Sequence, residues 1–109
     1  MNKIKNKLAK SFEEEYFFEA LFILFSLNEH IVKKEAKKYT NKRLSFKDAI
    51  DTIYKEQIIT EDFKLKLHIW REMRNDFVHK LVNSEIDEEK LRKMTLKGNE
   101  ILEILEKIN

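Results

Sequence analysis

The sequence predicts an all-α protein, and its proline and glycine content is the first reason. The 109 residues contain no proline and a single glycine, Gly98, so the residues that usually form the turns of β-rich folds are almost missing. Charged residues make up 39% of the chain and hydrophobic residues 42%, a mixture that favours a folded domain over disorder. We therefore expect residues 1–109 to form one domain, an up-and-down four-helix bundle with short connections.

The first predicted helix runs from Ser11 to about Tyr39. Ser11 followed by Glu14 matches a capping box, and the apolar residues that follow recur at spacings of three and four. The apolar surface of this helix is unusually wide, because it includes the further stripe Phe18, Phe22 and Phe25. A helix that is apolar nearly all round must be buried nearly all round, which one small bundle seldom achieves. We therefore expect a second subunit to cover part of this helix in a homodimer.

Cap residues mark the later helices. Ser45 starts a short second helix, and Thr60 caps a third helix that runs towards His79. Ser84 or Asp87 caps the last helix. Its apolar residues form a seam typical of nearly antiparallel packing: Leu91, Met94, Gly98, Ile101, Leu105 and Ile108.

Composition excludes several classes of function. The chain has no cysteine, which rules out disulfides and thiolate metal sites and agrees with a cytoplasmic protein. Its most apolar stretch, Tyr16 to Leu27, is short of the roughly 20 residues that span a bilayer, and the lysine-rich start does not match a signal peptide. The net charge of +2 is too small to indicate nucleic-acid binding by itself, so only its distribution can.

A basic stretch covers the end of the first predicted helix and the turn after it. It holds six cations, Lys33, Lys34, Lys37, Lys38, Lys42 and Arg43. Such a run is usually a solvated face that the helix dipole favours. The alternative interpretation is a patch that follows the backbone of RNA, with Glu35 as its only interruption.

An arginine interrupts the apolar seam of the third helix. Arg74 stands between Trp70 and Phe77, where the periodicity calls for a hydrophobic residue. A guanidinium directed toward a core needs an anionic or carbonyl partner, or a wet cleft or interface that leaves its head accessible. His79 lies five residues further on, about 140° around an unbroken helix. Either the helix frays between the two residues, or they converge on one substrate with help from a second copy.

The segment from Leu67 to His79 resembles the signature helix of HEPN domains. That signature has an arginine, a polar residue after it and a histidine four to six positions beyond it, here Arg74, Asn75 and His79. The resemblance implies a metal-independent endoribonuclease that needs no cofactor, of the kind found in antiviral defence and toxin–antitoxin systems. It also implies that two copies of the motif face each other across a dimer interface.

The three motif residues suit RNA cleavage. His79 can exchange a proton with the ribose 2′-hydroxyl or the leaving oxygen near neutral pH, and Arg74 can clamp the phosphate as its charge grows. Asn75 would orient either group. The products would carry 2′,3′-cyclic phosphate and 5′-hydroxyl ends.

In HEPN toxins controlled by a nucleotidyltransferase partner, a tyrosine two positions after the histidine is modified. The residue two positions after His79 is Leu81, which argues against control by that modification. Control by a protein antitoxin, or no control of this kind, stays open.

Other interpretations of the same residues stay open. The main alternative is a catalytically silent HEPN-like dimer that acts as a regulatory or protein-interaction module, and a bare helical assembly domain is a weaker one. His68 and Glu72 could chelate a metal, but His79 lies about 16 Å from His68 along a helix and cannot share the ion. A solvated polar stripe is favoured there. Helical spacing places Trp70 in the core or in a dimer interface.

Overall fold

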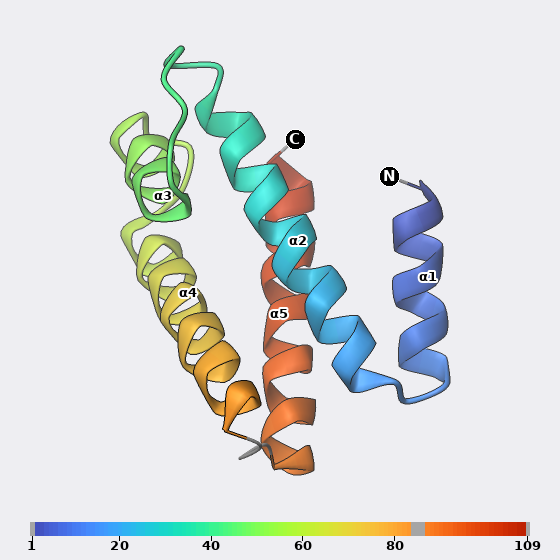
Figure 1. The fold of residues 1–109 in the computed structure, drawn as a ribbon. Coiled ribbons are helices and arrows are strands. Elements are labelled where there is room, and N and C mark those ends of the chain that lie inside the picture. The colour runs from blue at the N-terminus through green and yellow to red at the C-terminus, as the bar shows by residue number, and fades with distance from the viewer. Residues whose placement is uncertain (1, 84–86, 109) are drawn as a thin grey trace.

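The computed structural model describes residues 2–83 and 87–108, and all regular secondary structure in these ranges is helical (Figure 1). The helices are α1 (Asn2–Glu13), α2 (Phe17–Ala36), α3 (Phe46–Lys55), α4 (Glu61–Val82) and α5 (Glu88–Ile108). The all-α fold class is confirmed, but the described residues form five helices where four were expected. None of these helices has the length and apolar character needed to cross a membrane.

The first predicted helix, Ser11 to about Tyr39, covers the end of α1 and the whole of α2, with a break between them. Glu15, between α1 and α2, adopts a left-handed φ of 57°. The Glu15 N–H donates to the Phe12 carbonyl (3.1 Å) and the Tyr16 N–H to the Ser11 carbonyl (2.7 Å), the bonding pattern of a Schellman C-cap. The predicted capping role of Ser11 was therefore wrong, because Ser11 lies in the last turn of α1. The second of the two helices ends at Ala36, earlier than expected.

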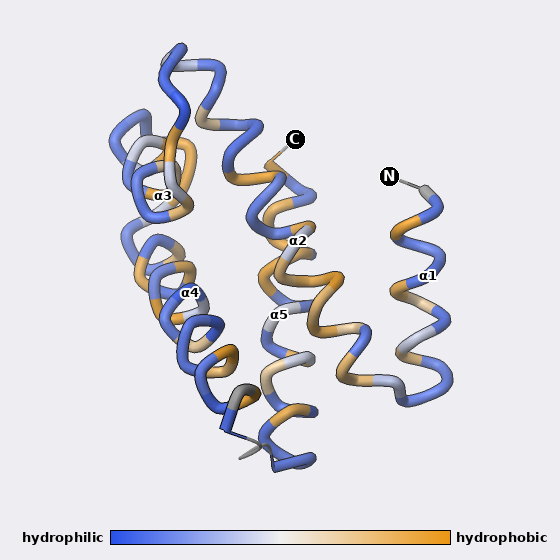
Figure 2. Tube along the Cα trace, viewed as in Figure 1, coloured by the Kyte–Doolittle hydropathy of each residue, from blue (hydrophilic) through white to orange (hydrophobic). Residues whose placement is uncertain are grey.

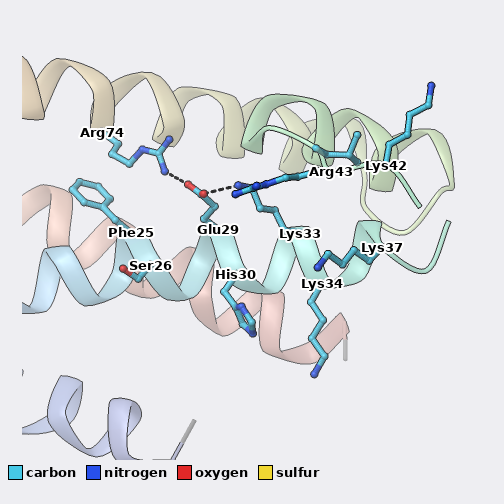
Figure 3. A pocket seen from close by; sticks show the side chains of 11 residues that line it. Phe25, Ser26, Glu29, His30, Lys33, Lys34, Lys37, Lys42, Arg43 and Arg74 are labelled. Carbon is cyan, nitrogen blue, oxygen red and sulfur yellow. Dashed lines mark hydrogen bonds and ion pairs between the residues drawn. The ribbon is translucent and has the colours of Figure 1, made fainter. Parts of the chain in front are cut away.

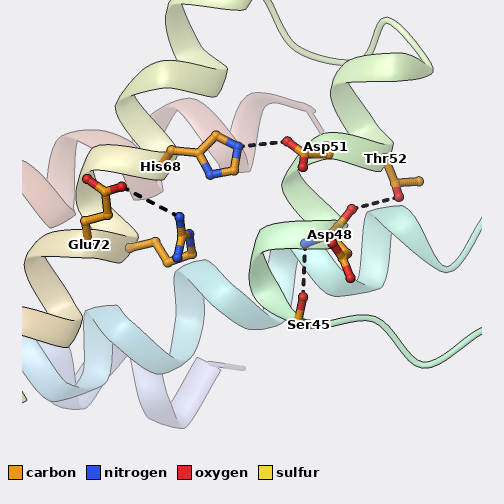
Figure 4. Close-up of polar contacts among 7 residues, drawn as sticks. Ser45, Asp48, Asp51, Thr52, His68 and Glu72 are labelled. Carbon is orange, nitrogen blue, oxygen red and sulfur yellow. Dashed lines mark hydrogen bonds and ion pairs between the residues drawn. The ribbon is translucent and has the colours of Figure 1, made fainter.

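The later helices begin where the cap residues indicate. The Ser45 hydroxyl accepts a hydrogen bond from a backbone N–H in the first turn of α3 at 3.1 Å (Figure 4). The Thr60 hydroxyl does the same for α4, also at 3.1 Å. The Asp87 carboxylate accepts from a backbone N–H at the start of α5 at 2.9 Å. Ser84, the other candidate cap, lies outside the described residues.

Helix α2 is the centre of the bundle, because it packs against α5, α3 and α1, while α3 also packs against α4. The four long helices alternate in direction along the chain, and the short α3 lies at one end of the bundle between α2 and α4 (Figure 1). Helices α2 and α5 consequently run in the same direction. The expectation that the seam of α5 packs against an antiparallel helix therefore does not describe its main contact.

The core is built around Trp70 of α4 and Gly98 of α5. Trp70 is fully buried, and its ring lies where a side chain at position 98 would be. The Gly98 carbonyl accepts a hydrogen bond from the buried Asn28 amide of α2 at 3.1 Å. Hydrophobic residues concentrate in the first half of α2 and along α5, where these helices meet the rest of the bundle (Figure 2). Other fully buried side chains are Leu21, Leu24, Ile50, Ile53, Leu67 and Leu105.

Candidate functional site

Helix α4 is unbroken around the motif and carries Arg74 toward α2. Its neighbours in the seam, Trp70 and Phe77, are buried, whereas the Arg74 side chain keeps 24% of its surface exposed. The guanidinium is hydrogen-bonded to the Glu29 carboxylate of α2, and its Cζ lies 5.2 Å from the centre of the Phe46 ring. Arg74 therefore has both an anionic partner and a side that is accessible to solvent, the two alternatives expected for an arginine in an apolar seam.

Glu29 joins Arg74 to the basic end of α2. One carboxylate oxygen of Glu29 pairs with Arg74, and the other lies 2.9 Å from the Lys33 Nζ (Figure 3). Partial burial alone would raise the pKa of Glu29, but the hydrogen bonds and charges of Lys33 and Arg74 outweigh it and hold the pKa below its ordinary value. Glu29 is therefore ionised at neutral pH, and the three side chains form a charged chain between α4 and α2.

This chain forms one side of an open cleft of about 580 Å³ between α2, the loop after it and α4. The lining residues are Phe25, Ser26, Glu29, His30, Lys33, Lys34, Lys37, Lys42, Arg43, Leu44 and Arg74. Six of them are lysines or arginines and one is a glutamate. Because the whole chain carries a net charge of only +2, the rest of the protein is net negative and the positive charge is concentrated at this cleft.

Most of the cations in the cleft are free to bind an anion. Lys34, Lys37, Lys42 and Arg43 form no ion pair with any residue in the described part of the chain. In Figure 3, Lys33 points toward Glu29, while Lys34 and His30 point to the other side of α2. The cleft therefore has an inner part around Arg74 and Glu29 and an outer rim formed by Lys37, Lys42 and Arg43.

The structure brings together two predictions that were separate in the sequence. Five of the six residues in the predicted basic patch line the same cleft as Arg74. The exception is Lys38, which pairs with the Glu35 carboxylate at 2.9 Å and does not line the cleft. Of the residues that complete the lining, Glu29 is the one that sequence reasoning missed most clearly. Its only signal was the position four residues before Lys33 on the same helix.

The other two motif residues lie away from the cleft. Asn75 and His79 are exposed and do not belong to its lining. The His79 Nε2 lies 3.4 Å from the Asn83 side-chain amide, one turn further along α4. Because α4 does not fray, Arg74 and His79 point in directions about 140° apart. One chain by itself does not bring its arginine and histidine to a common point.

An aromatic cluster continues the same side of the bundle beyond Arg74. The ring of Phe77 in α4 lies 5.8 Å from that of Phe18 and 6.1 Å from that of Phe22, centre to centre. Phe18 and Phe22 are each 40% exposed, whereas Phe25 is buried in the core of the monomer. The part of the predicted subunit interface that remains available is therefore Phe18 and Phe22.

Within the polar stripe of α4, His68 contacts another helix, whereas Glu72 is exposed. The His68 Nε2 lies 2.8 Å from an Asp51 carboxylate oxygen of α3, and Glu72 lies 3.9 Å from an Arg71 guanidinium nitrogen (Figure 4). Within residues 2–83 and 87–108, no group of three or more His, Asp or Glu side chains is placed to hold a metal ion. His68 acts here as a link between α3 and α4.

Comparison with known proteins adds no relative to this picture. No protein-family model, curated protein sequence or solved structure matches the chain.

Proposed function

We propose that this protein is a metal-independent endoribonuclease of the HEPN type that binds RNA in the cation-lined cleft. The observation that carries the proposal is the shared cleft of Arg74 and the basic stretch, whose described lining combines six lysine and arginine residues with a single carboxylate. A groove of this kind neutralises successive phosphates of a nucleic-acid strand. Arg74, at its inner end, is the residue whose planar fork matches a phosphate group.

Cleavage requires a second copy of the chain. His79 and Asn75 lie outside the cleft that contains Arg74, so a complete set of Arg, Asn and His needs an additional α4 helix. The exposed Phe18 and Phe22 lie on the same side of the bundle as Arg74 and offer an apolar surface for that copy. In the proposed homodimer, Arg74 of one subunit and His79 of the other act on the same phosphodiester.

The proposed reaction uses only side chains of this protein. Neutral His79 takes the proton of the ribose 2′-hydroxyl, whose oxygen attacks the neighbouring phosphorus. Arg74 stabilises the additional charge on the phosphate oxygens, and Asn75 orients the phosphate or the imidazole. The bond to the 5′-oxygen breaks, that oxygen takes up a proton from water, and His79 returns the proton it removed to solvent, which leaves a 2′,3′-cyclic phosphate and a 5′-hydroxyl. We place this activity in the cytoplasm, in a defence or toxin–antitoxin setting with a protein antitoxin as possible partner.

One observation favours the alternative of a catalytically silent dimer. The Arg74 guanidinium is already paired with Glu29 and lies near the Phe46 ring, so it links α2, α3 and α4 without any ligand. In a silent module, the only role of Arg74 would be to link these three helices, and His79 would be a surface residue without a function. The two functions differ in what His79 does, which gives a direct test.

The test is incubation of the purified protein with total RNA in the presence of a chelator, beside the His79→Ala variant. We expect cleavage by the wild type in chelator and a loss of roughly 10²–10⁴ in rate for the variant, because it lacks the proton-transfer group. RNA binding and the fold should be retained, since His79 is exposed. Equal cleavage by both proteins would show that His79 is not the catalytic group, and no cleavage by the wild type would favour the silent module.

A further inference from the structure

Glu29 is chemically out of place in the cleft. Among the described residues that line the cleft, it is the single carboxylate beside six lysine and arginine residues, and it occupies the inner end where Arg74 is directed. Its side chain is 28% exposed and that of Arg74 24%, so a ligand in the cleft can reach both groups. A phosphate that approaches Arg74 therefore meets a carboxylate that is already bound there.

A carboxylate and a phosphate present similar oxygen pairs to a guanidinium, so they compete for the same donors. We propose that Glu29 is an internal competitor of the ligand phosphate for Arg74. Arg74 then becomes available only to a phosphate chain that also reaches the free cations of the rim. This inference rests on the proposed RNA-binding function and adds the residue that sets its selectivity.

The geometry provides a second partner for the displaced carboxylate. When a phosphate takes the place of Glu29 on Arg74, the other Glu29 oxygen keeps its 2.9 Å contact with the Lys33 Nζ. The carboxylate is therefore not left unpaired, so the exchange costs little free energy when the ligand makes further contacts. A single phosphate has no such contacts, whereas an RNA chain also meets Lys37, Lys42 and Arg43. The cleft should consequently favour an RNA chain over a mononucleotide.

The substitution Glu29→Gln tests this competition. It keeps the size of the side chain and removes the charge that holds Arg74. The probe is a fluorescently labelled 2′-O-methyl oligouridylate, which lacks the nucleophile and is not cut, with uridine 5′-monophosphate as the short probe. We expect Glu29→Gln to bind the oligonucleotide about fivefold tighter, the value of a partly exposed ion pair. The salt dependence of its affinity should steepen by about 0.7, one additional phosphate contact.

Two controls separate this effect from a general change in charge. Glu72→Gln removes the same charge from an exposed position on α4 outside the cleft, and it should leave the affinity nearly unchanged. In an Arg74→Ala background, most of the gain from Glu29→Gln should disappear, because no guanidinium remains to be released and only Lys33 loses its partner. The mononucleotide should bind measurably to Glu29→Gln and much more weakly to the wild type.

The outcomes distinguish the inference from the proposed function. If the wild type binds the oligonucleotide and Glu29→Gln binds it no tighter, or if the full gain persists without Arg74, the inference is overturned while RNA binding stands. If neither protein binds, both proposals fail. Should circular dichroism show that Glu29→Gln is unfolded, Glu29→Asp replaces it, since its shorter side chain reaches Arg74 less well. A tighter complex than the wild type then supports the inference, and an equal or weaker one overturns it.

Discussion

Replacement of Gly98 by alanine should destabilise this protein, although alanine is the better helix former. An added Cβ would lie 2.9 Å from the Trp70 Cζ2, closer still to the Trp70 Cη2, and 3.2 Å from a Leu24 methyl carbon. Carbon atoms in favourable contact are about 3.5–4.0 Å apart. Trp70 and Leu24 are fully buried, so neither side chain can relieve the contact by moving into solvent.

Two opposing effects set the magnitude. Alanine stabilises a helix by about 1 kcal/mol relative to glycine, whereas overpacking of a tight core costs about 1–3 kcal/mol. Because the contact is with a rigid indole ring, we take the upper value, about 3 kcal/mol. The net loss is then about 2 kcal/mol, which lowers the melting temperature by roughly 8–16 °C.

Urea unfolding followed by the fluorescence of Trp70, the single tryptophan of the chain, measures this loss. Asn99→Ala is the matched control, because it improves helix propensity at the next position of α5 without adding an atom near Trp70. The cost of Gly98→Ala should fall in a Trp70→Phe background, where circular dichroism replaces fluorescence. A Gly98→Ala protein as stable as the wild type would refute the close approach of α4 and α5 at this point.

Three further predictions concern the cap of α4, the subunit interface and the Glu29 pair. Thr60→Ala should lower the free energy of unfolding by about 1 kcal/mol, measured in urea, because it removes the hydroxyl that caps α4; no loss would contradict that role. Phe22→Ser should convert the proposed dimer to a monomer in sedimentation with little change in helicity, since Phe22 is 40% exposed; a wild-type protein that sediments as a monomer would remove the interface. The pKa of Glu29 is lowered by Lys33 and Arg74 against the effect of burial, so its pairing contributes fully above the ordinary value of 4.5 and is lost as the pH falls through the lowered pKa. The difference in unfolding free energy between wild type and Glu29→Gln, measured in urea across pH, should shrink toward acid; a difference that grows there would contradict the pairing.

The helix boundaries show what the sequence could and could not predict. Ser45 and Thr60 precede α3 and α4, and their hydroxyl groups make the cap bonds that such residues indicate. The turn between α1 and α2 escaped prediction because Glu15, not glycine, takes the left-handed conformation there. Gln57 takes the same conformation after α3. With apolar residues in helical spacing on both sides, nothing local distinguishes the first break from a continuous helix.

The candidate site was predictable in part for similar reasons. The place of Arg74 in an apolar seam indicated that it needs a partner or a cleft, and both exist. The partner, Glu29, lies 45 residues away in the sequence and depends on how α2 packs, which periodicity does not determine. The same packing decides that five of the six predicted basic residues share the cleft while Lys38 turns to Glu35. The buried Asn28 bond to the Gly98 carbonyl gave no signal in the sequence at all.

The most direct test of the composite site mixes two inactive variants. Arg74→Ala and His79→Ala proteins are assayed for RNA cleavage in chelator, each alone and after they are unfolded and refolded together. If one subunit supplies the arginine and the other the histidine, each mixed dimer has one intact site, and the mixture should recover roughly a quarter of the wild-type activity. Failure of the mixture to cleave RNA while the wild type does so would contradict a site shared between two copies.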